Sequence, residues 1–259
     1  MKKDLKEKVL MPENLIFSIL LMLWIISFAV VVTLNFRPLY YFDVDYLDIP
    51  AVSGFDEELI RRNYDVLIDY NSMFFQGELE FPDLPMSESG RIHFQEVKTI
   101  FVGLQRFLIA DSLICAALLI RRIRRKSYAF LQLTGIVTIV IPVILGGLIA
   151  LNWNWVFVAF HHIVFNNDYW IFDKVTDPVI MMLPDTFFMH CALMILVLVV
   201  LGAAACLAAG CVLTGKNTCR KNTPCRERGS VKYDFSNYPL DKLPESGRIK
   251  FLINFYKET

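Results

Sequence analysis

Residues 15–34 read LIFSILLMLWIISFAVVVTL, and this uncharged run decides the fold. Its length matches the roughly 20 residues with which an α-helix crosses the hydrocarbon core of a bilayer. The chain of 259 residues is 55% hydrophobic with a mean hydropathy of +0.46, above that of ordinary soluble domains. The preceding MKKDLKEK resembles the start of a signal peptide, but the apolar run is too long and no small-residue cleavage site follows it. We therefore interpret the run as an uncleaved first transmembrane helix.

Three further apolar runs follow in the chain. Residues 128–151 and 191–213 carry no charge, whereas residues 99–120 contain Arg106 and Asp111. We expect both charged side chains to face the bundle interior, because a charge facing lipid is costly. One such run could be a buried helix of a soluble protein, but four in a small chain favour a membrane protein. We predict an all-α membrane protein with four transmembrane helices, at about 15–34, 99–120, 128–151 and 189–213, and with two outward-facing loop or helix segments, 35–98 and 152–188, that form an extracytoplasmic cap.

Basic residues set the expected orientation. They gather in three clusters, at residues 2–8, 121–126 and 216–228. With four spans these clusters lie on one side of the membrane, and the positive-inside rule makes that side cytoplasmic. We therefore expect a multi-pass protein with both termini in the cytoplasm. Its parts are an N-terminus at 1–13, a four-span membrane domain at 14–213 and a cytoplasmic tail at 214–259.

The first outward segment opens with RPLYYFDVDYLDIP at residues 37–50, which we expect to be extended. Ser53 followed three residues later by Asp56 then predicts a capping box that starts a helix. The apolar residues of that helix recur at helical spacing and share one face; they are Leu59, Tyr64, Leu67 and Ile68. The segment is therefore predicted to pack one helical face into the cap.

Three of the four histidines lie on the outward segments. His93 comes just before the second run, and His161 and His162 lie in the aromatic stretch AFHHIVFNNDYWIF at residues 159–172. A neutral imidazole is polar, and its pKa near 6.5 allows it to move protons at working pH. Adjacent helical residues point about 100° apart, so only one of the pair can serve a given centre. These histidines are candidates for acid–base catalysis or metal binding, or they only anchor the headgroup zone. We expect His190 to be a plain interface residue.

Two ordered motifs carry a resemblance. S-x-x-G-x-x-H-F-x-E-V-K occupies residues 87–98, and F-H-x-x-x-F-x-x-x-x-W-x-F-x-x-x-x-D-P occupies residues 160–178; upstream, N-Y-x-x-L-x-x-Y occupies 63–70. Together they resemble the four-span membrane protein family that contains the bacterial lipoprotein intramolecular transacylase. The resemblance covers residues 14–213 and places the family's histidine of the second motif on His161. The chain departs from the family at Val164, where an aromatic residue is commoner, and in its longer tail.

The resemblance implies a membrane acyltransferase with a catalytic domain at 14–213. It would move the sn-2 acyl chain of a diacylglyceryl lipoprotein to the α-amine of the N-terminal cysteine, giving lyso-form lipoprotein, by acid/base catalysis with His93 and His161. The active site would lie at the outer leaflet of the bacterial cytoplasmic membrane. Substrate-binding or supporting residues would be Tyr64, Glu96, Lys98, Arg106, Phe165, Trp170 and Asp177. Expected partners are diacylglyceryl lipoproteins and membrane lipids; we expect no cofactor, metal or nucleic acid, and the sequence sets no oligomeric state.

Two of the supporting residues have alternative partners in the sequence. Glu96 could orient His93, which precedes it by one helical turn, or it could pair with Lys98. Asp177 could satisfy Arg91 or the backbone of a turn before Pro178. Trp170, together with Phe165 and Phe172, would line the entry of the acyl chain.

The alternative function is a membrane metal-binding protein that uses the outward histidines and carboxylates. A haem between two histidines is excluded because no run contains a central histidine. Transporters usually carry charges in several spans, whereas only residues 99–120 do here. The outward segments offer no nucleophilic cysteine and no G-x-S-x-G elbow, and an intramolecular transfer needs neither.

Overall fold

The structure is a computed structural model that describes residues 11–222. Every regular element in this range is a helix, which confirms the predicted all-α class. In chain order the helices are α2 (Pro12–Asn35), α3 (Arg37–Tyr46), α4 (Ile49–Ser53), α5 (Glu57–Tyr70), α6 (Glu88–Arg124), α7 (Ala129–Leu151), α8 (Trp153–Val164), α9 (Val179–Met182) and α10 (Asp185–Asn222). The predicted tail beyond residue 222 and the basic cluster at residues 2–8 lie outside the described residues.

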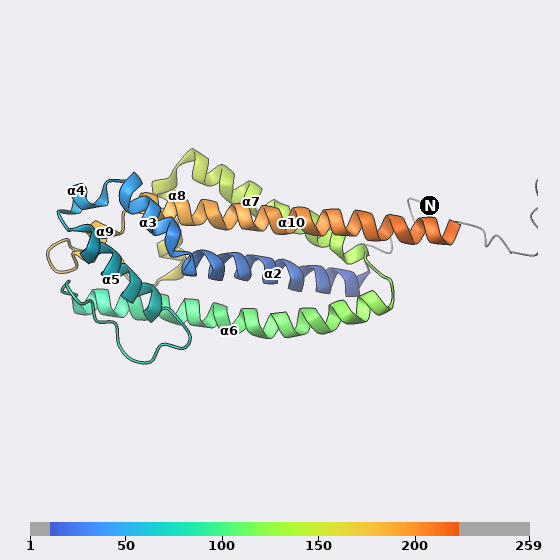
Figure 1. The fold of residues 1–259 in the computed structure, drawn as a ribbon, viewed down its shortest axis with the longest axis horizontal. Helices are drawn as coiled ribbons and strands as arrows, with labels where there is room; N and C mark the ends of the chain where they lie inside the picture. The colour runs from blue at the N-terminus through green and yellow to red at the C-terminus, as the bar shows by residue number, and fades with distance from the viewer. Residues whose placement is uncertain (1–10, 223–259) are drawn as a thin grey trace, which may run out of the picture. The chain divides into compact units, whose positions relative to one another are not determined.

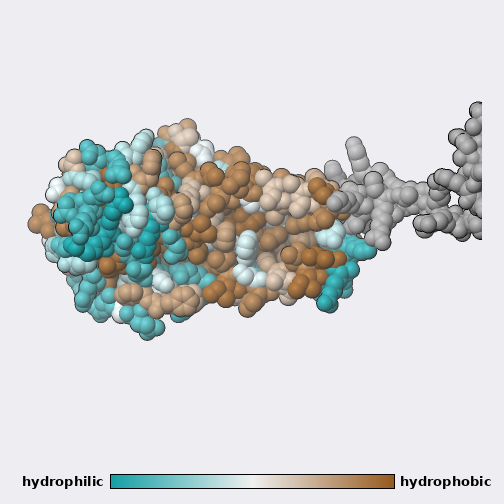
Figure 2. Space-filling view, in the orientation of Figure 1, coloured by the Kyte–Doolittle hydropathy of each residue, from teal (hydrophilic) through white to brown (hydrophobic). Residues whose placement is uncertain are grey.

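Four of the described helices, α2, α6, α7 and α10, are long and apolar enough to cross a membrane. They lie side by side, and the short helices gather at one end of them (Figure 1). Trp24 on α2 donates a hydrogen bond to Ser112 on α6 at 2.8 Å, and Ser18 on α2 donates to the carbonyl of Phe130 at 3.0 Å. Such bonds stabilise helix pairs where water is absent. Figure 2 shows hydrophobic surface along the long helices and hydrophilic surface over the short ones, as expected for a four-span protein with a cap.

Helix α6 is longer than a membrane crossing requires. Its 37 residues span about 56 Å at 1.5 Å per residue, whereas the hydrocarbon core is about 30 Å thick. It starts at Glu88, in the cap, and Gln105 still donates to the carbonyl of Asn71 at 2.8 Å, so the α5–α6 loop runs beside it. Asp111, deeper in the helix, is buried as predicted. Arg106 is exposed instead of facing the bundle interior, so that prediction is wrong. It follows Gln105, which contacts the α5–α6 loop, and its long side chain can extend its charged end toward water.

The start of the cap is helical rather than extended, so the prediction for residues 37–50 is wrong. Pro38 lies in the first turn of α3, where a helix tolerates proline. Tyr40 and Val44, one turn apart, are fully buried. The ring of Tyr40 stacks on Tyr64 of α5 at 3.6 Å between centroids, and its hydroxyl donates to the carbonyl of Met182 at 2.7 Å. Tertiary packing of this one face therefore makes residues 37–46 helical, although their aromatic and β-branched composition favours a strand.

Helix α5 begins later than predicted. Its cap is Asp56, whose carboxylate accepts the backbone N–H of Leu59 at 2.8 Å, and not Ser53. Ser53 ends α4, and Gly54 follows with a left-handed φ of 76°, which glycine adopts without strain.

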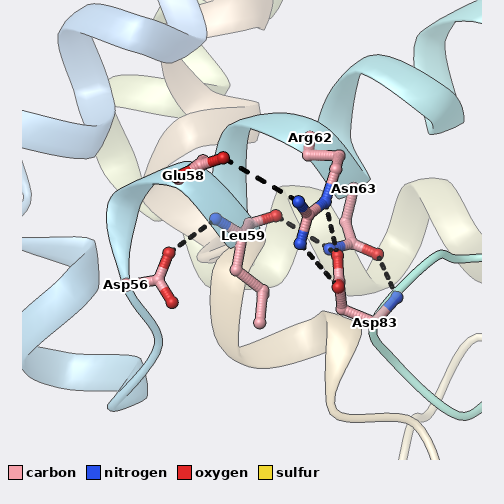
Figure 3. A network of polar contacts seen from close by, with 6 residues as sticks. All are labelled: Asp56, Glu58, Leu59, Arg62, Asn63 and Asp83. Atoms are coloured by element: carbon pink, nitrogen blue, oxygen red, sulfur yellow. Dashed lines mark hydrogen bonds and ion pairs between the residues drawn. The ribbon is translucent and has the colours of Figure 1, made fainter.

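A polar network ties the α5–α6 loop to α5 (Figure 3). Arg62 donates two hydrogen bonds to the Asp83 carboxylate, at 2.9 and 2.6 Å. Asn63, which is fully buried, donates to the same carboxylate at 2.8 Å. Paired guanidinium–carboxylate bonds fix geometry as well as charge, so this network holds the loop in place before α6 begins.

Candidate active site

The start of α6 is anchored to the segment between α8 and α9. Ser87 caps the helix, with its hydroxyl accepting the N–H of Gly90 at 3.0 Å. The Asp177 carboxylate accepts the N–H of Ser87 at 2.8 Å and the hydroxyl of Thr176 at 2.7 Å. A negative charge suits a helix N-terminus. A Cβ on Gly90 would overlap the carboxylate of Asp177, so only glycine permits this approach.

The structure gives Asp177 neither of its two predicted partners, which were Arg91 and the backbone of a turn before Pro178. Arg91 forms its ion pair with Glu88, at 2.6 Å, and does not bind Asp177. Asp177 instead satisfies backbone at the start of α6, 90 residues earlier in the chain. It is therefore a residue that positions the helix carrying His93.

His93 lies in the second turn of α6 and is only 6% exposed. Its neighbour Phe94 packs in the cap core, and the apolar run of α6 at residues 99–120 begins six residues after His93. The His93 ring contacts Phe165 and Phe172, with centroid distances of 4.8 and 5.4 Å, and lies 6.3 Å from the ring of His161. Burial, with a smaller contribution from His161, lowers the pKa of His93 to about 4. His93 is therefore neutral at working pH.

His161, near the end of α8, has a defined tautomer. Its Nδ1 lies 2.7 Å from the carbonyl oxygen of Phe157. A carbonyl only accepts, so Nδ1 carries the proton and Nε2 carries the free lone pair. The indole of Trp170 stacks on the ring at 4.6 Å. Burial lowers the pKa of His161, against the opposing effect of the Phe157 carbonyl, so the imidazole is a neutral base.

The two adjacent histidines have different surroundings. His161 is half-buried and near His93, whereas His162 is exposed and meets Trp170 edge-on at 5.4 Å. The structure therefore brings one of the pair to His93, and the other lies at the surface.

Glu96 has a partner that sequence reasoning missed. The side-chain amide of Asn167 donates to Glu96 Oε1 at 2.9 Å. Lys98 instead donates to the carbonyl of Phe75 at 3.3 Å and lies 4.1 Å from the centre of the Tyr70 ring. Within residues 11–222 neither predicted partner of Glu96 forms a bond with it. The polar pair in FNNDYW was the only sequence signal for Asn167.

Some predicted site residues lie elsewhere. Tyr64 belongs to the cap core, stacked on Tyr40. Lys98 holds the α5–α6 loop. Arg106 lies 13 residues beyond His93, about 20 Å along the helix axis. The residues that the structure does bring together are His93, Glu96, His161, Phe165 and Trp170, with Phe157, Asn167 and Phe172 around them.

The fourth histidine has a separate role. His190 on α10 lies 2.7 Å from the carboxylate of Asp43 on α3, which is fully buried. The prediction of a plain interface residue is wrong, because this contact joins the cap to a long helix. In the described part of the chain, no three His, Cys, Asp or Glu side chains lie close enough to hold a metal ion, so the metal-binding alternative has no ligand set there.

Comparisons with known proteins point to one family. A model of the family described as lipoprotein intramolecular transacylase Lit matches residues 15–188. The in meso structure of the membrane integral lipoprotein intramolecular transacylase Lit from Bacillus cereus is 39% identical, with a TM-score of 0.78, over 80% of this chain and 96% of that one. Two structures of the same protein with one histidine replaced, by arginine or by alanine, are also 39% identical, each with a TM-score of 0.72; they cover 80% of this chain and 92% and 94% of their own. No curated protein matches the chain.

Proposed function

The chain belongs to the lipoprotein intramolecular transacylase family, and from this premise we propose that it moves the sn-2 acyl chain of a diacylglyceryl lipoprotein onto the α-amine of the N-terminal cysteine. It is an integral membrane enzyme of the family, with four apolar helices. The single observation that carries the proposed mechanism is the pair of neutral imidazoles, His93 and His161, enclosed together by aromatic rings.

The reaction makes defined demands on the site. A bond forms between the amine nitrogen and the ester carbonyl carbon, and the bond from that carbon to the glyceryl oxygen breaks. The nitrogen loses a proton and the glyceryl oxygen gains one. Because nucleophile and ester belong to one substrate molecule, orientation supplies much of the rate, and no enzyme nucleophile is needed.

His161 is the base in this proposal. Its Nδ1–H is committed to the Phe157 carbonyl, so Nε2 takes the proton from the attacking nitrogen and returns it to the leaving glyceryl oxygen. Burial keeps the imidazole neutral and ready to accept. The carbonyl bond also stabilises the imidazolium that forms during the step.

His93 acts on the carbonyl oxygen of the ester in this proposal. Its low pKa keeps it neutral, and a neutral imidazole donates one N–H, here to the oxyanion that develops on the carbonyl oxygen. Phe165 and Phe172 pack against His93 and Trp170 against His161. These rings exclude water, which would otherwise hydrolyse the ester, and they line the entry of the acyl chain from the membrane lipid phase.

We place the site at the outer leaflet of a bacterial cytoplasmic membrane. The last turn of α6 carries Arg121, Arg122 and Arg124, at the end opposite the cap (Figure 1). Basic residues favour the cytoplasmic side, so the cap would face outward and both termini inward. The catalytic unit would be residues 14–213, and diacylglyceryl lipoproteins would reach it from the outer leaflet.

The test is mass spectrometry of a lipoprotein's N-terminal peptide. The protein is expressed in a bacterium that makes diacylglyceryl lipoproteins and lacks N-acylation. We expect one acyl chain on nitrogen and one on glycerol, with the total mass unchanged. A peptide that stays diacylglyceryl, with the protein confirmed in the membrane, contradicts the proposal.

Variants test the roles of the histidines. His93→Ala and His161→Ala should each lower the rate by about 10²–10⁴-fold, the usual contribution of a positioned acid–base group. His162→Ala is the matched control, because its exposed ring lies next to His161 in sequence and outside the pair. Equal rates in all three variants would remove the histidines from the mechanism.

A further inference from the structure

Three buried polar atoms around the histidine pair have no hydrogen-bond partner within residues 11–222. They are His93 Nδ1, Glu96 Oε2 and Trp170 Nε1. Buried polar groups usually have a partner, so unpaired ones beside a candidate site are available to a ligand. Imidazole and indole can donate to an oxygen, whereas a carboxylate only accepts. The residues around the histidine pair therefore offer two groups that can donate to the ester, His93 and Trp170, and one acceptor, Glu96, which has no role yet in the proposed chemistry.

The carboxylate of Glu96 is held in a fixed orientation. It lies three residues after His93, on the same side of α6. The Asn167 amide nitrogen donates to its Oε1 at 2.9 Å, and the Asn167 amide oxygen accepts the N–H of Tyr169 at 3.1 Å. Because both ends of the Asn167 amide are bound, the amide cannot turn without losing a bond. One oxygen of Glu96 is thereby fixed, and the other remains buried and available.

No protein cation neutralises this carboxylate in the described part of the chain. Lys98, the basic residue nearest in sequence, is bound to the carbonyl of Phe75 and the ring of Tyr70. Arg91, on the same helix, is paired with Glu88. A half-buried carboxylate left without a cation beside a reaction centre is suited to a cationic ligand.

We propose that Glu96 binds the α-amine of the substrate's N-terminal cysteine, with Asn167 as its positioning residue; this rests on the proposed transacylase function. The amine is the group that becomes positive as the carbon–nitrogen bond forms, before His161 removes the proton. Glu96 Oε2 accepts an N–H of that nitrogen and stabilises its positive charge, while His93 stabilises the negative charge on the ester oxygen. After proton transfer the product is a neutral amide, which Glu96 holds less strongly, so the same contact favours release.

The experiment measures binding apart from turnover. His161→Ala enzyme in lipid nanodiscs is titrated with a synthetic diacylglyceryl-cysteinyl peptide and with a counterpart that lacks only the α-amino group. The second probe is smaller, so steric exclusion cannot explain weaker binding. We expect the amine to improve affinity by about 10- to 100-fold, the range of a charge-assisted hydrogen bond.

Glu96→Gln in the same background should reduce this preference to less than about threefold, because glutamine keeps an oxygen for Asn167 but loses the charge. Glu96→Asp should restore part of the preference, and Asn167→Ala should lower it several-fold. Glu88→Gln, which removes a carboxylate already paired with Arg91 on the same helix, is the control and should leave the preference unchanged.

A full amine preference in Glu96→Gln overturns the inference. If that variant does not fold, a full preference in Asn167→Ala overturns it instead. Turnover by the unmodified enzyme is measured in parallel with the same peptide. Absence of transacylation there defeats the proposed function, whereas normal transacylation with an amine preference independent of Glu96 defeats this inference alone.

Discussion

Replacing Gly90 by alanine tests the contact that positions the helix carrying His93. A Cβ there would overlap Asp177 Oδ1 and lie 3.2 Å from a ring carbon of Phe172. The Asp177 carboxylate must then move away from the N–H of Ser87, which it now binds at 2.8 Å. Phe172, which packs against His93, must move as well.

The expected loss of stability follows from three effects. Overpacking costs about 1–3 kcal/mol. Loss of a hydrogen bond to a charged group costs about 1.5–3 kcal/mol. Alanine in a helix regains about 0.5–1 kcal/mol relative to glycine. The net destabilisation of Gly90→Ala is about 2–5 kcal/mol, which lowers Tm by about 5 °C or more in a protein of this size.

Gly103→Ala is the matched control in the same helix, because a Cβ there would meet no atom within 4 Å. We expect its Tm to equal or slightly exceed that of the parent. Both variants are purified in the same detergent, and helix content is followed by circular dichroism at one heating rate. Activity should fall by tenfold or more only in Gly90→Ala, since a shift of about 1 Å near the chemistry can cost about 10²-fold.

Two results would refute this reasoning. One is a Gly90→Ala Tm as high as that of Gly103→Ala. The other is additivity with Asp177→Ala. Removing the carboxylate also removes the overlap with Asp177 and leaves only the contact with Phe172, so Gly90→Ala should cost less stability in the Asp177→Ala background than in the parent.

Trp170→Ala should move the acid-side fall of kcat/KM to higher pH. Burial lowers the pKa of His161, so exposing its ring raises that pKa, and the imidazole is protonated at a higher pH than in the parent. A pH–rate profile checks this, and Tyr169→Ala, a change at an exposed residue, is the control whose profile should match that of the parent. Asp83→Asn should lower Tm at pH 7, and the difference from the parent should shrink as the pH falls below about 3.9. The Arg62 side chain lowers the pKa of Asp83, so its contribution is present above the unfolded pKa of about 3.9 and is lost as pH falls through the lower folded-state pKa. Tyr40→Phe should cost about 1–3 kcal/mol, measured as a lower Tm, because the buried carbonyl of Met182 loses its donor.

Hydropathy in the sequence predicted the membrane class, and the resemblance of two motifs to a known family predicted the histidine pair. The length and composition of the four apolar runs are local properties of the sequence, and they indicate membrane-spanning helices independently of how the loops fold. The motifs around His93 and His161 likewise singled out residues that the structure places 6.3 Å apart between ring centroids. The expected extended stretch at residues 37–50 failed because aromatic composition favours strands, whereas burial of Tyr40 and Val44 on one face stabilises a helix.

The partners of the charged residues in the site were decided only by the tertiary structure. Glu96 binds Asn167 across 71 residues and Asp177 binds Ser87 across 90, while the nearer candidates Lys98 and Arg91 have partners of their own. Helical spacing describes neighbours one turn apart, but the path of the α8–α9 segment depends on the packing of the whole cap. Hydrophobic length is therefore readable from the sequence, whereas the choice between competing hydrogen-bond partners requires the folded backbone to bring one of them within 3 Å.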